Sequence, residues 1–231
     1  ERVVHSLQEV EETARAASGE FLEGRLRLGV IRTLGPYLLP EVLPSVERNW
    51  SGLELEIDEG LTDRLLDSLC QHELDAVLMA LPWEIPDEVL LHDCFDEPFY
   101  VGLSPDDILA DRTSIALDEI DPDDLLLLRE GHCLRDHTLE ACDIPPGGTR
   151  RAFQGASLET IRAFVANGWG VGLFPALAVD ERGDVVFRPP TEPAHRTVAL
   201  AIRRSFPYAA EAAEMATEIG RIVQGILPQR G

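Results

Sequence analysis

Two cysteines in one short segment could carry redox chemistry. Cys133 follows His132 and precedes Arg135, and Cys142 comes nine positions later. An apolar run, 125–128, and a short break come before Cys133. It is therefore expected at the start of a helix, where free backbone N–H groups favour a thiolate. His132 and Arg135 can add positive charge near the sulfur. Because the thiolate is the reactive form of cysteine, Cys133 is the better candidate nucleophile.

The spacing of these cysteines sets what a disulfide would require. In one continuous helix, a rise of about 1.5 Å per residue holds the Cα atoms of Cys133 and Cys142 roughly 13 Å apart. A disulfide needs less than about 7 Å. The pair can join only if the segment between them unwinds, and the breaker Pro145-Pro146-Gly147-Gly148 offers slack, so oxidation would be a conformational switch. On spacing alone, two inert thiols that pack as small hydrophobic groups are the more common case.

The remaining cysteines do not predict a metal site. Cys70 lies in a helical apolar pattern and Cys94 beside an expected strand, so both are expected to pack in the interior. The chain has no Cys-x-x-Cys pair and no close histidine cluster of the kind that zinc sites use. We therefore expect neither a metal nor a cofactor.

Composition and charge bound the class of protein. With 231 residues, 45% of them hydrophobic, the chain can bury a core in one domain or in two small lobes. A net charge of −22 opposes binding to a phosphate backbone, so this chain alone is not expected to bind DNA. No apolar stretch is long enough to span a bilayer and no signal core is present, which predicts a cytoplasmic protein without a membrane partner.

Hydrophobic periodicity predicts an α/β fold in which strands and helices alternate. Such alternation indicates two lobes, each a mostly parallel sheet flanked by helices, with a ligand cleft. Residues 1–23 have the pattern of one amphipathic helix. The other expected helices are 37–48, 62–71, the segment after Cys133, 158–167 and 208–226; the expected strands are 26–31, 53–57, 75–81, 89–94, 99–103, 125–128, 151–153, 171–174, 184–187 and 197–202.

Several stretches resemble one family. The segment 131–136, together with Cys142, is similar to the redox segment of the OxyR family, the peroxide-sensing regulators of the LysR type. Four other stretches match the same family in the same order, and the resemblance runs from about Gly24 to the C-terminus. They are Thr33-Leu34-Gly35-Pro36-Tyr37-Leu38-Leu39-Pro40, Phe95-Asp96-Glu97-Pro98, Ala156-Ser157-Leu158-Glu159-Thr160 and Leu173-Phe174-Pro175-Ala176-Leu177-Ala178-Val179.

The resemblance implies a regulatory domain with a two-lobed fold like that of periplasmic binding proteins. Residues 1–23 would be the end of a linker helix, 24–94 with 200–231 would form lobe I, and 95–199 would form lobe II with the redox cysteines. The DNA-binding domain would lie outside this chain. The implied function is hydrogen peroxide sensing by a transcription activator of the oxidative stress response. The sensor would be used stoichiometrically, not as an enzyme.

The resemblance also implies roles for single residues. Cys133 would react with peroxide and Cys142 would resolve the product by forming a Cys133–Cys142 disulfide. Thr33, Thr62 and His132 match residues of the peroxide pocket. Arg135 and Asp136 match the residues that follow the reactive cysteine and are expected to take part in ligand binding as well. From the sequence alone, capping is the favoured explanation of Thr33 and Thr62, because a threonine before a helix is more often a cap than a ligand-binding group.

The implied partners are hydrogen peroxide, a second copy of the domain in a homodimer, and further copies in a full-length homotetramer. DNA would be bound only through the missing N-terminal domain, and RNA polymerase is a candidate partner. Two other functions remain open. One is a domain that binds an organic effector, in another LysR-type regulator or in a solute-binding protein. The other is a thiol peroxidase that turns over with an external reductant.

Overall fold

The computed structural model describes residues 23–145, 154–180 and 183–227. The predicted helix 1–23, apart from its last residue, lies outside the described residues, as do the predicted strand 151–153 and most of the breaker that follows Cys142. The described residues divide into two compact units: 23–95 with 197–227, and 96–196. Along the chain, strands β4 (Val89–Leu103) and β9 (His195–Arg203) each run from one unit into the other.

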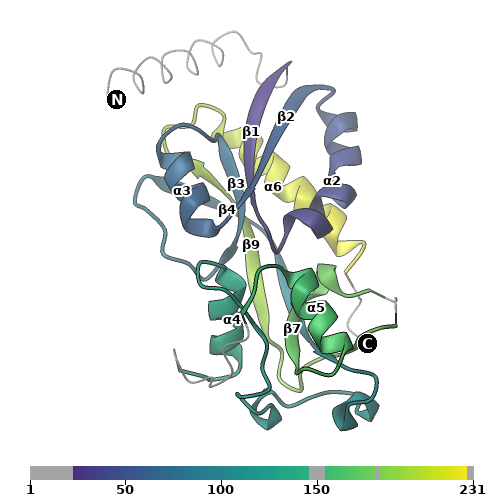
Figure 1. The fold of residues 1–231 in the computed structure, drawn as a ribbon. Coiled ribbons are helices and arrows are strands. Elements are labelled where there is room, and N and C mark those ends of the chain that lie inside the picture. The colour runs from purple at the N-terminus through teal and green to yellow at the C-terminus, as the bar shows by residue number, and fades with distance from the viewer. Residues whose placement is uncertain (1–22, 146–153, 181–182, 228–231) are drawn as a thin grey trace. The chain divides into compact units, whose positions relative to one another are not determined.

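The first unit is built on a sheet with the strand order β2-β1-β3-β9. β1 pairs in parallel with β2 and β3, while β3 pairs with β9 in the antiparallel direction. Helix α2 packs against α6 and β2, and α3 packs against β1 and β3 (Figure 1). The elements completed within this unit are β1 (Glu23–Ile31), α2 (Gly35–Asn49), β2 (Gly52–Gly60), α3 (Thr62–Cys70), β3 (Ala76–Leu81) and α6 (Ala209–Gln224).

The local sequences explain these positions in the sheet. β3 is an uninterrupted apolar run and is buried along almost its whole length, as expected of a central strand. β2 lies at the edge of the sheet and is mostly exposed, with Glu54, Glu56 and Asp58 on its surface. Charged side chains on an edge strand discourage pairing with another chain.

The second unit has a mixed sheet arrangement. The distal part of β4 pairs in the antiparallel direction with β7 and β8, and the short strands β5 and β6 pair in parallel. The expectation of a mostly parallel sheet therefore describes the first unit better than the second, because periodicity carries no information on strand direction. The elements of this unit are β5 (Leu127–Leu128), α4 (Cys133–Ala141), β6 (Gln154–Gly155), α5 (Leu158–Ala166), β7 (Gly172–Pro175), β8 (Val186–Arg188) and the 3-10 turns η1 (Ile108–Asp111), η2 (Leu117–Glu119) and η3 (Ala176–Ala178).

The sequence predicts two separate strands where the structure has one. The segments 89–94 and 99–103 form the single strand β4, which continues through Glu97 and Pro98. A carboxylate followed by proline is typical of a break in a strand. Here the Glu97 side chain is completely buried and paired with an arginine from β9, so it is part of the interior.

Candidate functional site

Cys133 is the first residue of helix α4, as the sequence predicts. The residue before the helix, His132, has an extended backbone, and Gly131 has φ 88°. A side chain at position 131 would strain this left-handed conformation, so a glycine is favoured there. The turn at Gly131 lets the helix begin two residues later, at Cys133. The first backbone N–H groups of a helix have no partner within it, and they favour a negative charge. Cys133 is only 1% exposed, so the sulfur is held inside the unit.

Cys142 lies at the other end of the same helix. It follows Ala141 as the C-terminal cap, and its backbone N–H donates to the Thr138 carbonyl at 3.1 Å. Neither cysteine is part of a disulfide. Because α4 is continuous between them, their Cα atoms are about 13 Å apart by helical geometry, so a disulfide requires α4 to unwind.

The pKa values of three cysteines are raised by burial. Desolvation brings that of Cys142 to about 11, so its thiol stays protonated at neutral pH. Cys70 and Cys94, expected in the interior, are half-buried, and desolvation is the largest cause that raises their pKa values to about 11 and about 12. None of the three is therefore suited to attack peroxide first.

The inner face of α4 packs into the second unit. Leu134 and Leu139 are 2% and 6% exposed, which confirms the expectation that they lie in the core. Thr138 is also buried, and its hydroxyl donates to the Leu134 carbonyl at 2.7 Å. Unwinding α4 would remove these apolar side chains from their packing, so the rearranged chain must repack them.

The two residues after Leu134 differ in their exposure to solvent. The Arg135 guanidinium is part-buried, and its Nη1 donates to the carbonyl of Leu128, at the end of β5, at 3.2 Å. Asp136 is exposed in the first turn of α4. Five of the predicted site residues thus belong to α4 and its two caps: His132, Cys133, Arg135, Asp136 and Cys142.

Thr33 and Thr62 belong to the first unit, where each follows the carboxyl end of a strand. They are 3% and 1% exposed. The explanation that each caps a helix is wrong, because the N-cap residues are Leu34 and Leu61 and neither helix has a side-chain cap bond. Among the described residues, Thr62 Oγ1 is buried without a hydrogen-bond partner. A buried hydroxyl in that state is suited to a small polar ligand.

A buried ion pair in the second unit was missed by the sequence reasoning. Arg196 Nε and Nη2 each lie 2.8 Å from Glu97 Oε2, and both side chains are fully buried. The other carboxylate oxygen of Glu97 accepts the backbone N–H of Leu177 in η3 at 3.0 Å. On the same turn, the Ala178 carbonyl accepts a bond from buried Arg162. Two buried charges therefore hold η3.

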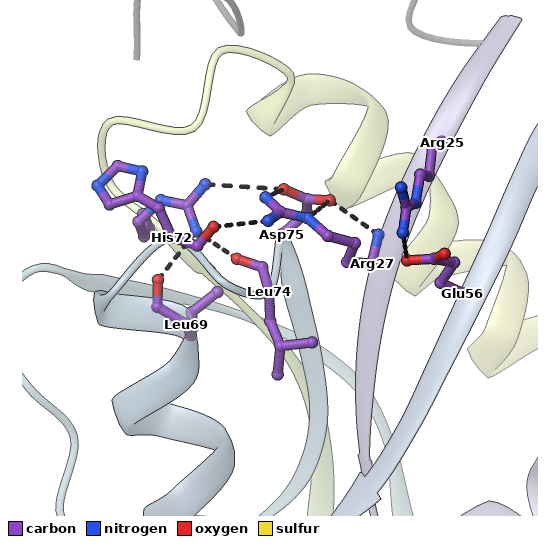
Figure 2. Close-up of polar contacts among 8 residues, drawn as sticks. Arg25, Arg27, Glu56, Leu69, His72, Leu74 and Asp75 are labelled. Carbon is purple, nitrogen blue, oxygen red and sulfur yellow. Dashed lines mark hydrogen bonds and ion pairs between the residues drawn. The ribbon is translucent and has the colours of Figure 1, made fainter. Parts of the chain in front are cut away.

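A second polar cluster lies in the first unit, at the start of β3. The carboxylate of Asp75 accepts bonds from Arg27 Nη2 at 2.6 Å and Nε at 3.1 Å, and Arg27 Nη1 donates to the His72 carbonyl at 2.7 Å (Figure 2). Arg203, at the end of β9, donates to the Leu69 carbonyl at 2.9 Å. An acidic residue directly before an apolar strand was the signal for such a cluster, since a carboxylate at that position needs a buried partner.

The described residues contain no metal-binding cluster of three or more His, Cys, Asp or Glu side chains. Within the same ranges, no helix combines the length and the hydrophobicity that crossing a membrane requires.

Comparison with protein families and known proteins identifies this architecture. The family model of the LysR substrate binding domain matches residues 19–220. The chain is 35% identical over 227 residues to the hydrogen peroxide-inducible genes activator of Pectobacterium carotovorum, covering 96% of this chain and 75% of that protein. It is also 35% identical over 225 residues to the DNA-binding transcriptional dual regulator OxyR of Escherichia coli, covering 95% of this chain and 73% of the relative.

Solved structures agree with these sequence matches. The reduced form of the OxyR regulatory domain from Pseudomonas aeruginosa is 40% identical with a TM-score of 0.77, over 87% of this chain and 98% of that one. A full-length OxyR variant from the same organism is 38% identical with a TM-score of 0.80, over 94% of this chain and 76% of the other. These matches confirm the predicted fold class. The chain belongs to the LysR family of transcriptional regulators, as a regulatory domain of the OxyR type.

Proposed function

We propose that this chain is the hydrogen peroxide-sensing regulatory domain of a transcription activator, and that it switches through a Cys133–Cys142 disulfide. The observation that carries the proposal is the placement of two cysteines, not joined by a disulfide, at opposite ends of one nine-residue helix, with Cys133 at its start. With this placement, the disulfide can form only if the helix unwinds. The relatives named as hydrogen peroxide-inducible genes activators support peroxide as the signal.

The first chemical step is attack by the Cys133 thiolate on one oxygen of hydrogen peroxide. A sulfur–oxygen bond forms, the oxygen–oxygen bond breaks, and hydroxide leaves and takes up a proton to become water. Sulfur is oxidised and the peroxide is reduced. We assign Thr33, Thr62 and His132 to binding the peroxide, where a hydroxyl or imidazolium donor would stabilise the leaving oxygen. The unsatisfied Oγ1 of Thr62 supports its part in this assignment.

The second step uses the thiol of Cys142. Its sulfur attacks the sulfenic sulfur of Cys133, the sulfur–oxygen bond breaks, and water leaves with the thiol proton. Two thiols are oxidised and one peroxide becomes two waters. Because burial holds the pKa of Cys142 at about 11 in the helical state, this thiol is suited to follow Cys133 and not to precede it.

The output follows from the rearrangement of α4. Repacking Leu134 and Leu139 changes the surface of the second unit, and such a change can alter how subunits pair. We propose that the domain forms homodimers and that the full-length protein forms homotetramers in the cytoplasm. DNA would be bound by a separate N-terminal domain, with RNA polymerase as the target of activation. The sensor would be oxidised once per signal, without turnover.

The test treats the reduced domain with one equivalent of hydrogen peroxide, alkylates it, and maps the cysteines by mass spectrometry. We expect a Cys133–Cys142 crosslink, with Cys70 and Cys94 alkylated. Cys133→Ser should lose all reaction with low peroxide, whereas Cys142→Ser should still form the sulfenic acid and fail to form the disulfide. Equal reactivity of the two variants would contradict the assigned roles.

The same samples separate the other functions. An organic effector would raise the melting temperature of the Cys133→Ser variant, and both Cys133 and Cys142 would stay free after peroxide treatment. A thiol peroxidase would consume many equivalents of peroxide in the presence of a recycling thiol system, whereas a stoichiometric sensor would consume about one per domain before re-reduction.

A further inference from the structure

We propose that Arg135 is a positioning residue that latches the first turn of α4 to strand β5 and thereby holds the helical, reduced state. The effect of this contact on disulfide formation rests on the proposed redox function, whereas its effect on the stability of α4 does not. The latch itself is a contact between two elements of the second unit. Arg135 Nη1 donates to the Leu128 carbonyl at 3.2 Å across seven positions of sequence.

The acceptor side of the latch is fixed. Leu128 is 3% exposed and pairs with Gly155 in the parallel β5–β6 ladder. The next residue, Arg129, donates its backbone N–H to the Gly155 carbonyl at 3.1 Å. A Cβ atom at Gly155 would come 2.6 Å from the Ile161 side chain of α5, so β6 and α5 are in close contact. The Leu128 carbonyl is therefore anchored to α5 through β6.

The donor side of the latch is the part that must move. Arg135 is the third residue of α4, only two positions after Cys133. A disulfide between Cys133 and Cys142 requires this turn to unwind, which moves the Arg135 backbone and breaks its bond to Leu128. The bond thus belongs to the helical state alone, and a bond present in only one of two states shifts the equilibrium toward that state.

The chemistry of the bond makes it strong enough to matter. Arginine donates with a full positive charge, and hydrogen bonds to charged groups are stronger than neutral ones. Arg135 is part-buried, so water screens the bond less than it would on the surface.

The first test needs no redox chemistry. Hydrogen exchange of the reduced domain, followed by mass spectrometry, measures how often α4 opens. In Arg135→Ala we expect the amides of 134–141 to exchange about tenfold faster, while those of α5 are unchanged. The matched control is Arg129→Ala, which removes the same charge from an exposed side chain in the adjacent segment. Unchanged exchange of α4 in Arg135→Ala, or an equal effect of both variants, would overturn the latch.

The second test measures its consequence. Equilibration with a dithiol buffer should show the disulfide of Arg135→Ala favoured about tenfold over that of the unsubstituted chain and of Arg129→Ala. The rate of the condensation that follows sulfenic acid formation should be raised in Arg135→Ala and not in Arg129→Ala. A slower first step with an unchanged second step would mean that Arg135 serves the thiolate and not the helix, which overturns the latch. Faster exchange of α4 without any disulfide in the unsubstituted chain would retain the latch and refute the proposed function.

Discussion

The ion pair between Glu97 and Arg196 lies entirely inside the second unit. Both side chains are withdrawn from water completely, and removal of a charge from water is costly unless its partner and hydrogen bonds are in place. Glu97 uses one oxygen for Arg196 and the other for the Leu177 N–H, so each half of the carboxylate has a donor. The pair therefore fixes β4, β9 and η3 together, and neither member can be lost alone without penalty.

Glu97→Gln should lower the free energy of unfolding by about 3–5 kcal/mol, because it leaves the Arg196 guanidinium buried beside a neutral amide. Glutamine keeps an acceptor for the Leu177 N–H, so the loss reports the charge and not that backbone bond. Urea denaturation followed by circular dichroism measures the change. The matched control is Asp93→Asn, an exposed carboxylate of the same strand, with an expected effect within about 0.5 kcal/mol.

A double variant separates the cost of a lone charge from the value of the pair. Glu97→Gln with Arg196→Met should be more stable than the sum of the two single losses predicts, since no unpaired charge remains. If the two losses simply add, the ion pair is not coupled and the interpretation of this interior contact is wrong.

Among the secondary-structure elements, helices α2 and α6 are joined by one acidic side chain. Glu218 of α6 accepts bonds from Ser45 Oγ at 2.8 Å and Asn49 Nδ2 at 3.3 Å, both on α2. Arg221 of α6 donates to the same carboxylate at 2.6 and 2.7 Å. Bonds from Arg221, and next from Ser45, lower the pKa of Glu218 from 4.5 to about 2. The ionised carboxylate is thus the form that joins the two helices.

The pH dependence of stability should report this contact. A carboxylate whose pKa is lowered on folding stabilises the fold above its unfolded pKa, and that contribution is lost as pH falls through the folded pKa. Glu218→Gln should therefore be less stable than the unsubstituted chain above about pH 4.5, and the difference should vanish as pH falls toward about 2. Because Arg221 is largely exposed, solvent screening limits the difference to about 1 kcal/mol. The matched control is Glu214→Gln, which removes an exposed carboxylate one turn away on the same helix.

The elements also show which parts of the structure local sequence can predict. The alternation of strands and helices in the first unit and the start of α4 at Cys133 follow from periodicity and a glycine break, which are properties of neighbouring residues. The continuity of β4 does not, because Glu97 can be buried only with an arginine 99 positions away. The antiparallel pairing of β4 with β7 and β8 could not be predicted for the same reason, since these strands are distant in sequence.

The candidate site shows the same division. Cys133, Cys142 and the buried Leu134 and Leu139 could be placed on one helix from their spacing. The role of Arg135 could not, because its contact with Leu128 depends on where β5 ends relative to α4. The position of Thr62 differs from the capping prediction by one residue, because α3 begins at Thr62 itself. Leu61 occupies the cap, which leaves the Thr62 hydroxyl without the bond that the sequence offered it.

For the whole molecule, acidic residues greatly outnumber basic ones. The chain carries 42 acidic and 20 basic residues, and all the basic ones are arginine. Several of these arginines are used inside the units: Arg162, Arg196 and Arg203 are each at most 2% exposed and bind carboxylates or carbonyls. A planar guanidinium with five donors suits such buried contacts better than an ammonium group. The exposed surface is left with a large excess of carboxylates, which repel one another.

Salt should therefore stabilise the folded domain at neutral pH. Compaction brings the net charge of −22 into a small volume, and raising the ionic strength from about 10 to 150 mM shortens the screening length from roughly 30 to 8 Å. We expect the melting temperature to rise by several degrees over this range in sodium chloride, measured by calorimetry. Glycerol at equal osmolality serves as the control, because it does not screen charge. A melting temperature that stays constant or falls with salt would mean that attractive ion pairs, such as those of Arg25 and Arg112 on the surface, outweigh the repulsion among carboxylates.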